Sequence, residues 1–153
     1  MQFDPVSKKL RIDARELCHT VVNHASIDRR AAHIREDDGK VDELLEHRYG
    51  TNYHKKQALC RTVSRGGLFY EIGGTADGIA RESGKVTVCV NRLFGDYTSK
   101  LDTDRTAETV ALAALLACMV AESEMLGNVA FRITFFHNSR DIRVIEKSFS
   151  RRE

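Results

Sequence analysis

The stretch from Gly67 to Val90, GLFYEIGGTADGIARESGKVTVCV, decides the fold. Its first half contains two runs that favour strands, Leu68 to Ile72 and Thr75 to Arg81. The tetrapeptide Glu82-Ser83-Gly84-Lys85 is typical of a turn, and the β-branched run from Val86 to Val90 follows it. The sequence therefore predicts three consecutive strands.

A long helix and two further strands are predicted after this stretch. Asp102-Thr103 can cap a helix that runs to about Leu126, and the middle of this helix is apolar on all sides. Such a helix should be buried against the sheet. The two strands are expected at Val129 to Phe136 and Ile142 to Ser148, joined by a turn at residues 137–140. The helix side chains expected to pack on the sheet are Leu112, Leu115, Leu116 and Met119.

Helices are predicted before the strands. Residues from about Asp13 to Asn23 place apolar side chains on one helical stripe, and a second helix follows from about Asp28 to Tyr49. The second helix should be broken or kinked near Asp37-Asp38-Gly39. The segment from Asn52 to Ser64 is ambiguous, and a short helix is one interpretation of it.

This order of elements is typical of a single α/β (or α+β) domain built around one mixed sheet flanked by helices. We expect one domain over residues 1–153, with N-terminal helices at about 11–50 and a core at about 67–148. A chain of 153 residues, 42% of them hydrophobic, is long enough to bury such a core. The net charge is only +2, so any basic surface for nucleic acid must be local.

The cysteines are isolated, which argues against a zinc site and against a disulfide framework. They are expected to be small core residues of a reducing compartment, and they are Cys18, Cys60, Cys89 and Cys118. The N-terminus is polar, and the longest apolar run, Val110 to Ala121, is too short to span a bilayer. We therefore expect an intracellular, soluble protein with no cofactor and no membrane contact.

Two motifs lie in the predicted helix and strand that precede the third strand. Arg35-Glu36-Asp37-Asp38-Gly39-Lys40-Val41-Asp42-Glu43 matches R-x-x-x-G-x-x-x-E, and Gly74-Thr75-Ala76-Asp77-Gly78-Ile79 places an aspartate in G-x-x-D-G. With the αβββαββ order of elements, they resemble the PD-(D/E)XK (restriction endonuclease-like) superfamily, and its RecB-like and YqaJ-type exonucleases most. The resemblance covers about residues 30–148.

The resemblance implies a Mg²⁺ pocket in which Glu43 and Asp77 are joined by a Glu and a Lys of the third strand. At those two places this chain has Cys89 and Asn91, and the Q-x-x-x-Y signature expected on the long helix is missing. A neutral thiol is a poor Mg²⁺ ligand, and an amide lacks the charge that would stabilise a reacting phosphate. The resemblance therefore implies a vestigial pocket of Glu43, Asp77, Cys89 and Asn91, with no catalytic residue and no metal.

Plainer interpretations of the same residues stand beside this one. Asp77 could be a strand-end or bulge residue bonded to nearby backbone, and Glu43 a solvated helix residue paired with His47. Cys89 is most simply a core side chain. Four basic residues form a predicted basic group, namely Lys55, Lys56, Arg61 and Arg65. We expect this group to be a solvated face, and a remnant of a phosphate-facing surface is the less favoured interpretation.

An inactivated nuclease fold predicts a protein-interaction or scaffold module. Among inactivated members, the chain looks most like the pseudonuclease domain of a kinetoplastid kinetochore protein, which implies a nuclear role in chromosome segregation, kinetochore subunits as partners and weak DNA binding. The alternative is a nucleic-acid-binding module, or a Mg²⁺-dependent exonuclease whose missing carboxylate has migrated to Glu71 or Glu108. A migrated carboxylate would have to lie within coordination distance of Asp77.

Overall fold

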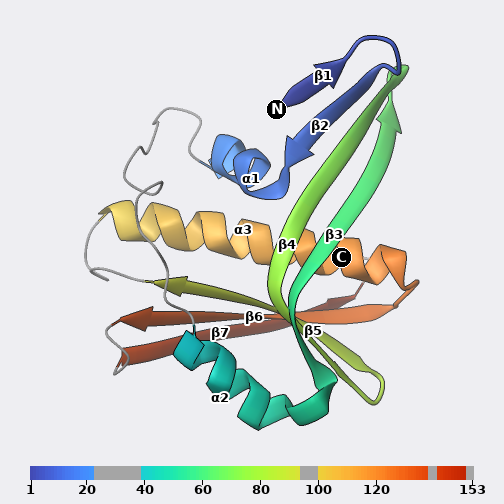
Figure 1. Ribbon diagram of the computed structural model, residues 1–153. Coiled ribbons are helices and arrows are strands. Elements are labelled where there is room, and N and C mark those ends of the chain that lie inside the picture. The colour runs from blue at the N-terminus through green and yellow to red at the C-terminus, as the bar shows by residue number, and fades with distance from the viewer. Residues whose placement is uncertain (23–38, 94–99, 138–140, 151–153) are drawn as a thin grey trace.

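The computed structural model describes the backbone of residues 1–22, 39–93, 100–137 and 141–150, and the side chains of residues 1–21, 41–92, 106–136 and 143–150. Its helices are α1 (Ala14–Val22), α2 (Gly39–Tyr49), which continues into the short 3-10 helix η2 (Gly50–Asn52), and α3 (Lys100–Ser123). Its strands are β1 (Gln2–Asp4), β2 (Lys9–Asp13), β3 (Tyr53–Arg65), β4 (Leu68–Glu82), β5 (Lys85–Leu93), β6 (Asn128–His137) and β7 (Asp141–Ser150). Figure 1 shows these elements as ribbons.

The strands form one mixed sheet, as the sequence predicts. Its order is β1-β2-β4-β5-β6-β7, and β3 pairs with β4 outside this path. The pairs β2–β4 and β5–β6 are parallel, and the other pairs are antiparallel. The α/β fold class is therefore confirmed.

Helices cover both faces of this sheet (Figure 1). On β5, Val88 and Val90 belong to a large core with α1 and α3, whereas Cys89 between them belongs to a small core with α2. Because successive side chains of a strand point to opposite faces, the two cores lie on opposite sides of the sheet. The small core consists of Val41, Leu45, Tyr49, Tyr53, Ala80, Cys89 and Phe136.

Helix α3 is the central helix of the large core. Leu112, Leu116 and Met119 are buried as predicted, and Leu115 is partly buried against the same core. By length and composition alone, Thr106–Ser123 could cross a membrane, but here its apolar side chains pack on the sheet and on α1.

The N-terminal half departs from the prediction. Asn52 is the last residue of η2, and residues 53–64 form nearly the whole of strand β3 and not a short helix. The two strands expected between Leu68 and Arg81 are one strand, β4. The sequence also gave no sign of the hairpin β1–β2, which lies beside β4. Most side chains of β3 are exposed, so hydrophobic spacing could not reveal it.

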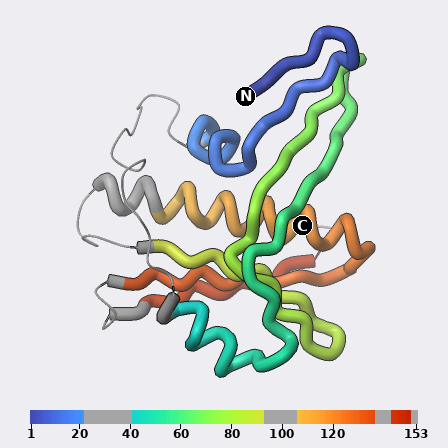
Figure 2. The backbone as a smooth tube through the Cα atoms, viewed as in Figure 1, coloured from blue at the N-terminus to red at the C-terminus, as the bar shows by residue number. Residues whose placement is uncertain are grey.

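These four strands form a projecting arm. The arm consists of β1, β2, residues 58–65 of β3 and residues 68–75 of β4, and the smooth trace in Figure 2 shows its outer end extending beyond the helices. The second predicted helix is described only from Gly39 onward, as α2; its first part, including Arg35 of the R-x-x-x-G-x-x-x-E motif, lies outside the described residues.

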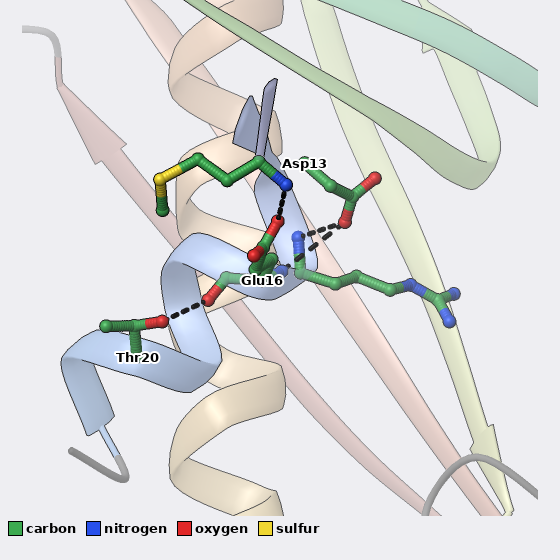
Figure 3. A network of polar contacts seen from close by, with 5 residues as sticks. Asp13, Glu16 and Thr20 are labelled. Carbon is green, nitrogen blue, oxygen red and sulfur yellow. Dashed lines mark hydrogen bonds and ion pairs between the residues drawn. The ribbon is translucent and has the colours of Figure 1, made fainter. Parts of the chain in front are cut away.

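Helix α1 begins directly where β2 ends, at a capping aspartate. The Asp13 carboxylate accepts the backbone N–H groups of Arg15 at 2.8 Å and Glu16 at 3.4 Å, which an N-cap side chain is expected to do. Figure 3 shows this network, in which Glu16 also accepts the Met1 ammonium at 3.0 Å and the Thr20 hydroxyl donates to the Glu16 carbonyl at 2.8 Å. The helix predicted from Asp13 is thus present, and its start is tied to the arm.

Candidate functional site

Three of the four predicted pocket residues lie together where β4 and β5 meet. The backbone N–H of Asn91 donates to Asp77 Oδ2 at 2.7 Å, and Asn91 is fully buried. Cys89, two residues earlier on β5, lies in the small core. Glu43 is exposed on α2, and no hydrogen bond or ion pair among the described side chains joins it to these three residues. Its place in the pocket therefore stays a prediction.

Asp42 lies where Glu43 was expected. Asp42 is buried, and its Oδ1 accepts the Tyr53 hydroxyl at 3.1 Å and the Asn91 side-chain amide at 3.4 Å. It lies three residues before Leu45, one of the α2 side chains in the small core, so the helical period turns Asp42 toward the sheet and the next residue away from it. The spacing of the apolar stripe was the signal that could have identified Asp42.

At Lys56, the alternation of the β3 side chains between the two faces of the sheet shifts by one residue. Tyr53 lies in the small core, whereas Leu59 packs against the large core on the other face, although the two are an even number of residues apart. Lys56 has φ 49°, which is left-handed backbone and costs a residue with a side chain about 1–2 kcal/mol. Lys56 lies between the register pairs Lys55–Gly78 and Gln57–Ala76, beside Asp77, so the change of side falls at the candidate site.

Strand β4 changes partners at the same place. Its pairing with β5 ends at Gly78 opposite Cys89, and its pairing with β2 ends at Gly73. The Asn91 N–H therefore has no β4 carbonyl opposite it, and the Asp77 carboxylate accepts this N–H instead. This agrees with the plainer interpretation of Asp77, in which the aspartate is bonded to nearby backbone at a strand irregularity.

The second oxygen of Asp77 has a cationic neighbour. Lys56 Nζ lies 3.4 Å from Asp77 Oδ1, with 57% of the lysine side chain exposed and 10% of the aspartate side chain exposed. Each carboxylate oxygen of Asp77 therefore has a hydrogen-bond donor from the chain itself. The ammonium also places a positive charge beside the pocket, and it comes from β3 and not from β5.

Burial keeps the Cys89 thiol and the Tyr53 hydroxyl neutral. Burial, more than any neighbouring charge, raises the pKa of the Cys89 thiol to about 12. Burial is also the main reason that the pKa of the Tyr53 hydroxyl is raised, followed by the neighbouring Cys89 and Asp42. At neutral pH, Tyr53 is therefore a hydrogen-bond donor to Asp42, and Cys89 is an uncharged core thiol.

The residues present do not fit the Mg²⁺ site that the sequence resemblance implies. Mg²⁺ requires near-octahedral oxygen ligands, whereas both Asp77 oxygens accept protein donors and the Lys56 ammonium would repel a cation. Asn91 Oδ1 is a buried acceptor with no hydrogen-bond partner, but it is a single neutral oxygen. Within the part of the chain that the structure describes, no three His, Cys, Asp or Glu side chains are grouped to hold a metal.

The two carboxylates suggested as migrated ligands have other partners. Glu71 lies in the arm, where it pairs with Lys9 at 3.2 Å and Arg11 at 3.4 Å, and it is six residues from Asp77 along one strand, about 20 Å. Glu108 lies on α3, across the sheet from the small core, and contacts His19 Nδ1 at 3.0 Å. Neither supplies a ligand beside Asp77.

Most of the predicted basic group is neutralised locally. Lys55 pairs with Glu46 at 2.5 Å, and Arg61 pairs with Glu122 of α3. Lys56 lies beside Asp77, so three of the four residues of the basic group contact an acidic side chain. This is consistent with a solvated face.

The cysteines divide into two classes. Cys18 and Cys89 are buried as expected, but Cys60 and Cys118 are exposed, so the prediction of core positions is wrong for those two. Cys60 is exposed because its stretch of β3 belongs to the arm, and Cys118 because it lies on an uncovered part of α3.

We expect thiol labelling to follow this division. At about pH 8, a disulfide reagent should modify both accessible cysteines of the native protein, Cys60 and Cys118, because thiolates are the reactive form. Cys118 should react more slowly than Cys60, because partial burial and the neighbouring Glu122 raise the pKa of the Cys118 thiol. Cys18, whose pKa burial raises to about 11, and Cys89 should react only in denaturant. Mass spectrometry of the labelled peptides measures this, and rapid native labelling of Cys89 would contradict its placement in the small core.

Comparison with known proteins supports the fold alone. No protein-family model matches the chain, and no curated protein matches it. A solved structure described as "Crystal structure of SSO0001" is similar, with a TM-score of 0.54 over 92% of this chain and 67% of that chain. The sequence identity is 12%, so the similarity concerns an α/β mixed-sheet architecture.

Proposed function

We propose that this domain is a catalytically inactive relative of the PD-(D/E)XK nucleases that acts as a protein-interaction or scaffold module. The observation that carries the proposal is the position of Asn91. Its side-chain amide donates to Asp42 and its backbone N–H donates to Asp77, so one buried neutral residue joins the two carboxylates of the pocket. A charged lysine, which the resemblance places there, would be needed to stabilise a reacting phosphate.

Two further features support an inactive pocket. Cys89, at the place of the third-strand glutamate, is a protonated thiol inside the small core and offers no charge to a metal. Tyr53 stacks with Tyr49 and donates to Asp42, so the helix carboxylate contributes to packing between α2 and β3. Residues that would serve chemistry in a nuclease serve the internal hydrogen bonding of this domain.

The narrower part of the proposal rests on the sequence resemblance. It places the domain in the nucleus, at the kinetochore, with other kinetochore proteins as partners in chromosome segregation. Recovery of such partners with the protein purified from its native cells would support this part, and exclusively cytoplasmic staining would argue against it.

A nucleic-acid-binding module is the second candidate, and Lys56 is the observation that favours it. Its side chain is more than half exposed beside Asp77, where the ammonium could contact a phosphate. Against this, the salt bridge to Asp77 already partly neutralises the lysine, and Lys55 beside it is paired with Glu46. The first function is therefore preferred.

A salt titration of DNA binding separates the two. At physiological salt, binding to duplex or single-stranded DNA should be no tighter than non-specific contact, roughly 10⁻⁴–10⁻⁶ M. Lys55→Ala and Lys56→Ala should change it no more than Lys147→Ala, which removes an exposed cation of β7. Submicromolar, salt-sensitive binding that is lost only in the two β3 variants would favour the nucleic-acid module.

A further inference from the structure

The two faces of the arm differ in chemistry. On one face, Glu71 of β4 pairs with Lys9 and Arg11 of β2. Phe69 points to this same face, since it is two residues from Glu71 on one strand and lies opposite Lys9. This face is charged and solvated.

The opposite face carries an apolar row that crosses all four strands. Phe3 of β1 lies opposite Leu10 of β2, Leu10 beside Tyr70 of β4, and Tyr70 opposite Val63 of β3. Residues directly opposite each other in a sheet point to the same face, so these four side chains form one continuous apolar row. The two ends of the row reach solvent, because Phe3 is 53% exposed and Val63 is 36% exposed.

The apolar row continues the large core beyond its helical cover. Ile72, two residues from Tyr70 and on the same face, packs against the large core. One step farther along the strands, about 7 Å, the row is only half-buried. A sheet with one charged and one apolar face normally buries the apolar one, so the apolar row has the character of a surface that another chain covers.

The dimensions of the apolar row indicate a small occupant. Four strands at about 4.8 Å spacing make a surface about 14 Å wide, comparable with the 10–12 Å diameter of one helix. A stable interface between two folded proteins needs about 800 Å² on each side, more than four half-buried side chains provide. The row therefore fits a short amphipathic helix.

The charge beside the apolar row indicates which charge the partner should carry next to it. Arg65 is on the same face as Val63, two residues along β3, and it is exposed without an acidic partner among the described side chains. Arg61, on the other side of Val63, is already paired with Glu122. A second copy of this chain is a poor occupant, because the apolar row offers less than the roughly 800 Å² on each side that a stable interface between two folded proteins needs.

We propose that the apolar row of Phe3, Leu10, Tyr70 and Val63 binds a short amphipathic helix of a partner protein, with an acidic side chain beside its apolar stripe to pair with Arg65. The proposal rests on the proposed function, because it assigns the surface through which a protein-interaction module engages its partner. The vestigial pocket has no part in it.

The test uses the whole chain and a display library of peptides of about 16 residues, long enough for four helical turns. Selected peptides are then measured by fluorescence anisotropy against the wild type and four variants. Val63→Ser and Phe3→Ser remove the exposed ends of the row, and Arg65→Glu reverses the flanking charge. Phe69→Ser is the matched control, because this side chain is 44% exposed on the opposite face of the same strands.

We expect selected peptides to have apolar residues at helical spacing with a flanking Glu or Asp. Their affinity should fall about tenfold or more in Val63→Ser and Phe3→Ser, about fivefold in Arg65→Glu, and less than about twofold in Phe69→Ser. The Arg65→Glu change leaves the apolar row in place, so its effect reports on the flanking charge and not on the row. Equal effects of Phe69→Ser and Val63→Ser, no selectable peptide, or concentration-dependent dimers lost in Val63→Ser would overturn the proposal. Mg²⁺-dependent DNA cleavage by the same preparation would instead overturn the proposed function and leave the peptide result standing.

Discussion

Replacement of Gly78 with alanine is expected to destabilise the domain by about 3 kcal/mol or more, a large part of a small domain's stability. A side-chain carbon at Gly78 would overlap the ring of Tyr53. Tyr53 cannot easily move, because it is buried in the small core and donates its hydroxyl to Asp42. Chemical denaturation followed by circular dichroism measures the loss.

Two control variants make the expected loss specific. Gly127→Ala adds a carbon with nothing within 4 Å and should change the free energy of unfolding by less than about 0.5 kcal/mol. In a Tyr53→Ala background, Gly78→Ala should cost much less than in the wild type, because the overlapping ring is gone. An unchanged midpoint for Gly78→Ala in the wild type would show that the β3–β4 contact is misplaced.

Leu116→Ala should destabilise the domain by about 2–5 kcal/mol. Leu116 is fully buried at the centre of the large core, and one of its methyl carbons lies so near β4 that a side-chain carbon at Gly74 would come within 2.9 Å of it. Truncation therefore removes packing against both the helix layer and the sheet. Thermal unfolding monitored by circular dichroism gives the change in stability.

The neighbouring leucine provides a matched control for this truncation. Leu115→Ala deletes the same atoms from a side chain that is only partly buried, so its cost should be clearly smaller than that of Leu116→Ala. Equal losses at the two positions would mean that α3 is rotated relative to the sheet. Stability unchanged in both variants would contradict the central position of α3.

The predictable part of the fold is the part with strong hydrophobic patterning. Strand β5 is β-branched and bounded by a turn, and α3 is apolar over several turns, so both could be predicted from the sequence. Strand β3 could not, because it is mostly exposed and is held by pairing along β4. The adjacent glycines Gly73 and Gly74 of β4 suggest a break, but Gly74 is needed for space beside Ala14 and Leu116 inside a continuous strand.

The candidate site was predictable only in part. Asp77 and Asn91 could be placed together, because they lie on strands expected to be neighbours. The helix carboxylate was assigned to Glu43 by a motif, whereas the helical stripe of the small core turns Asp42 inward. Lys56 could not be predicted beside Asp77, because a left-handed residue other than glycine has no signature in the sequence.

The central claim is that the pocket around Asn91 does not support phosphodiester cleavage. The most direct measurement is cleavage of labelled single- and double-stranded DNA by the purified protein with Mg²⁺ or Mn²⁺, compared with an Asp77→Ala variant. We predict no difference between the two proteins and no cleavage above a metal-free control. The Asn91 N–H and the Lys56 ammonium each contact one oxygen of the Asp77 carboxylate, and the Cys89 thiol carries no charge. Metal-dependent cleavage that co-purifies with the wild type and disappears in Asp77→Ala would contradict the account.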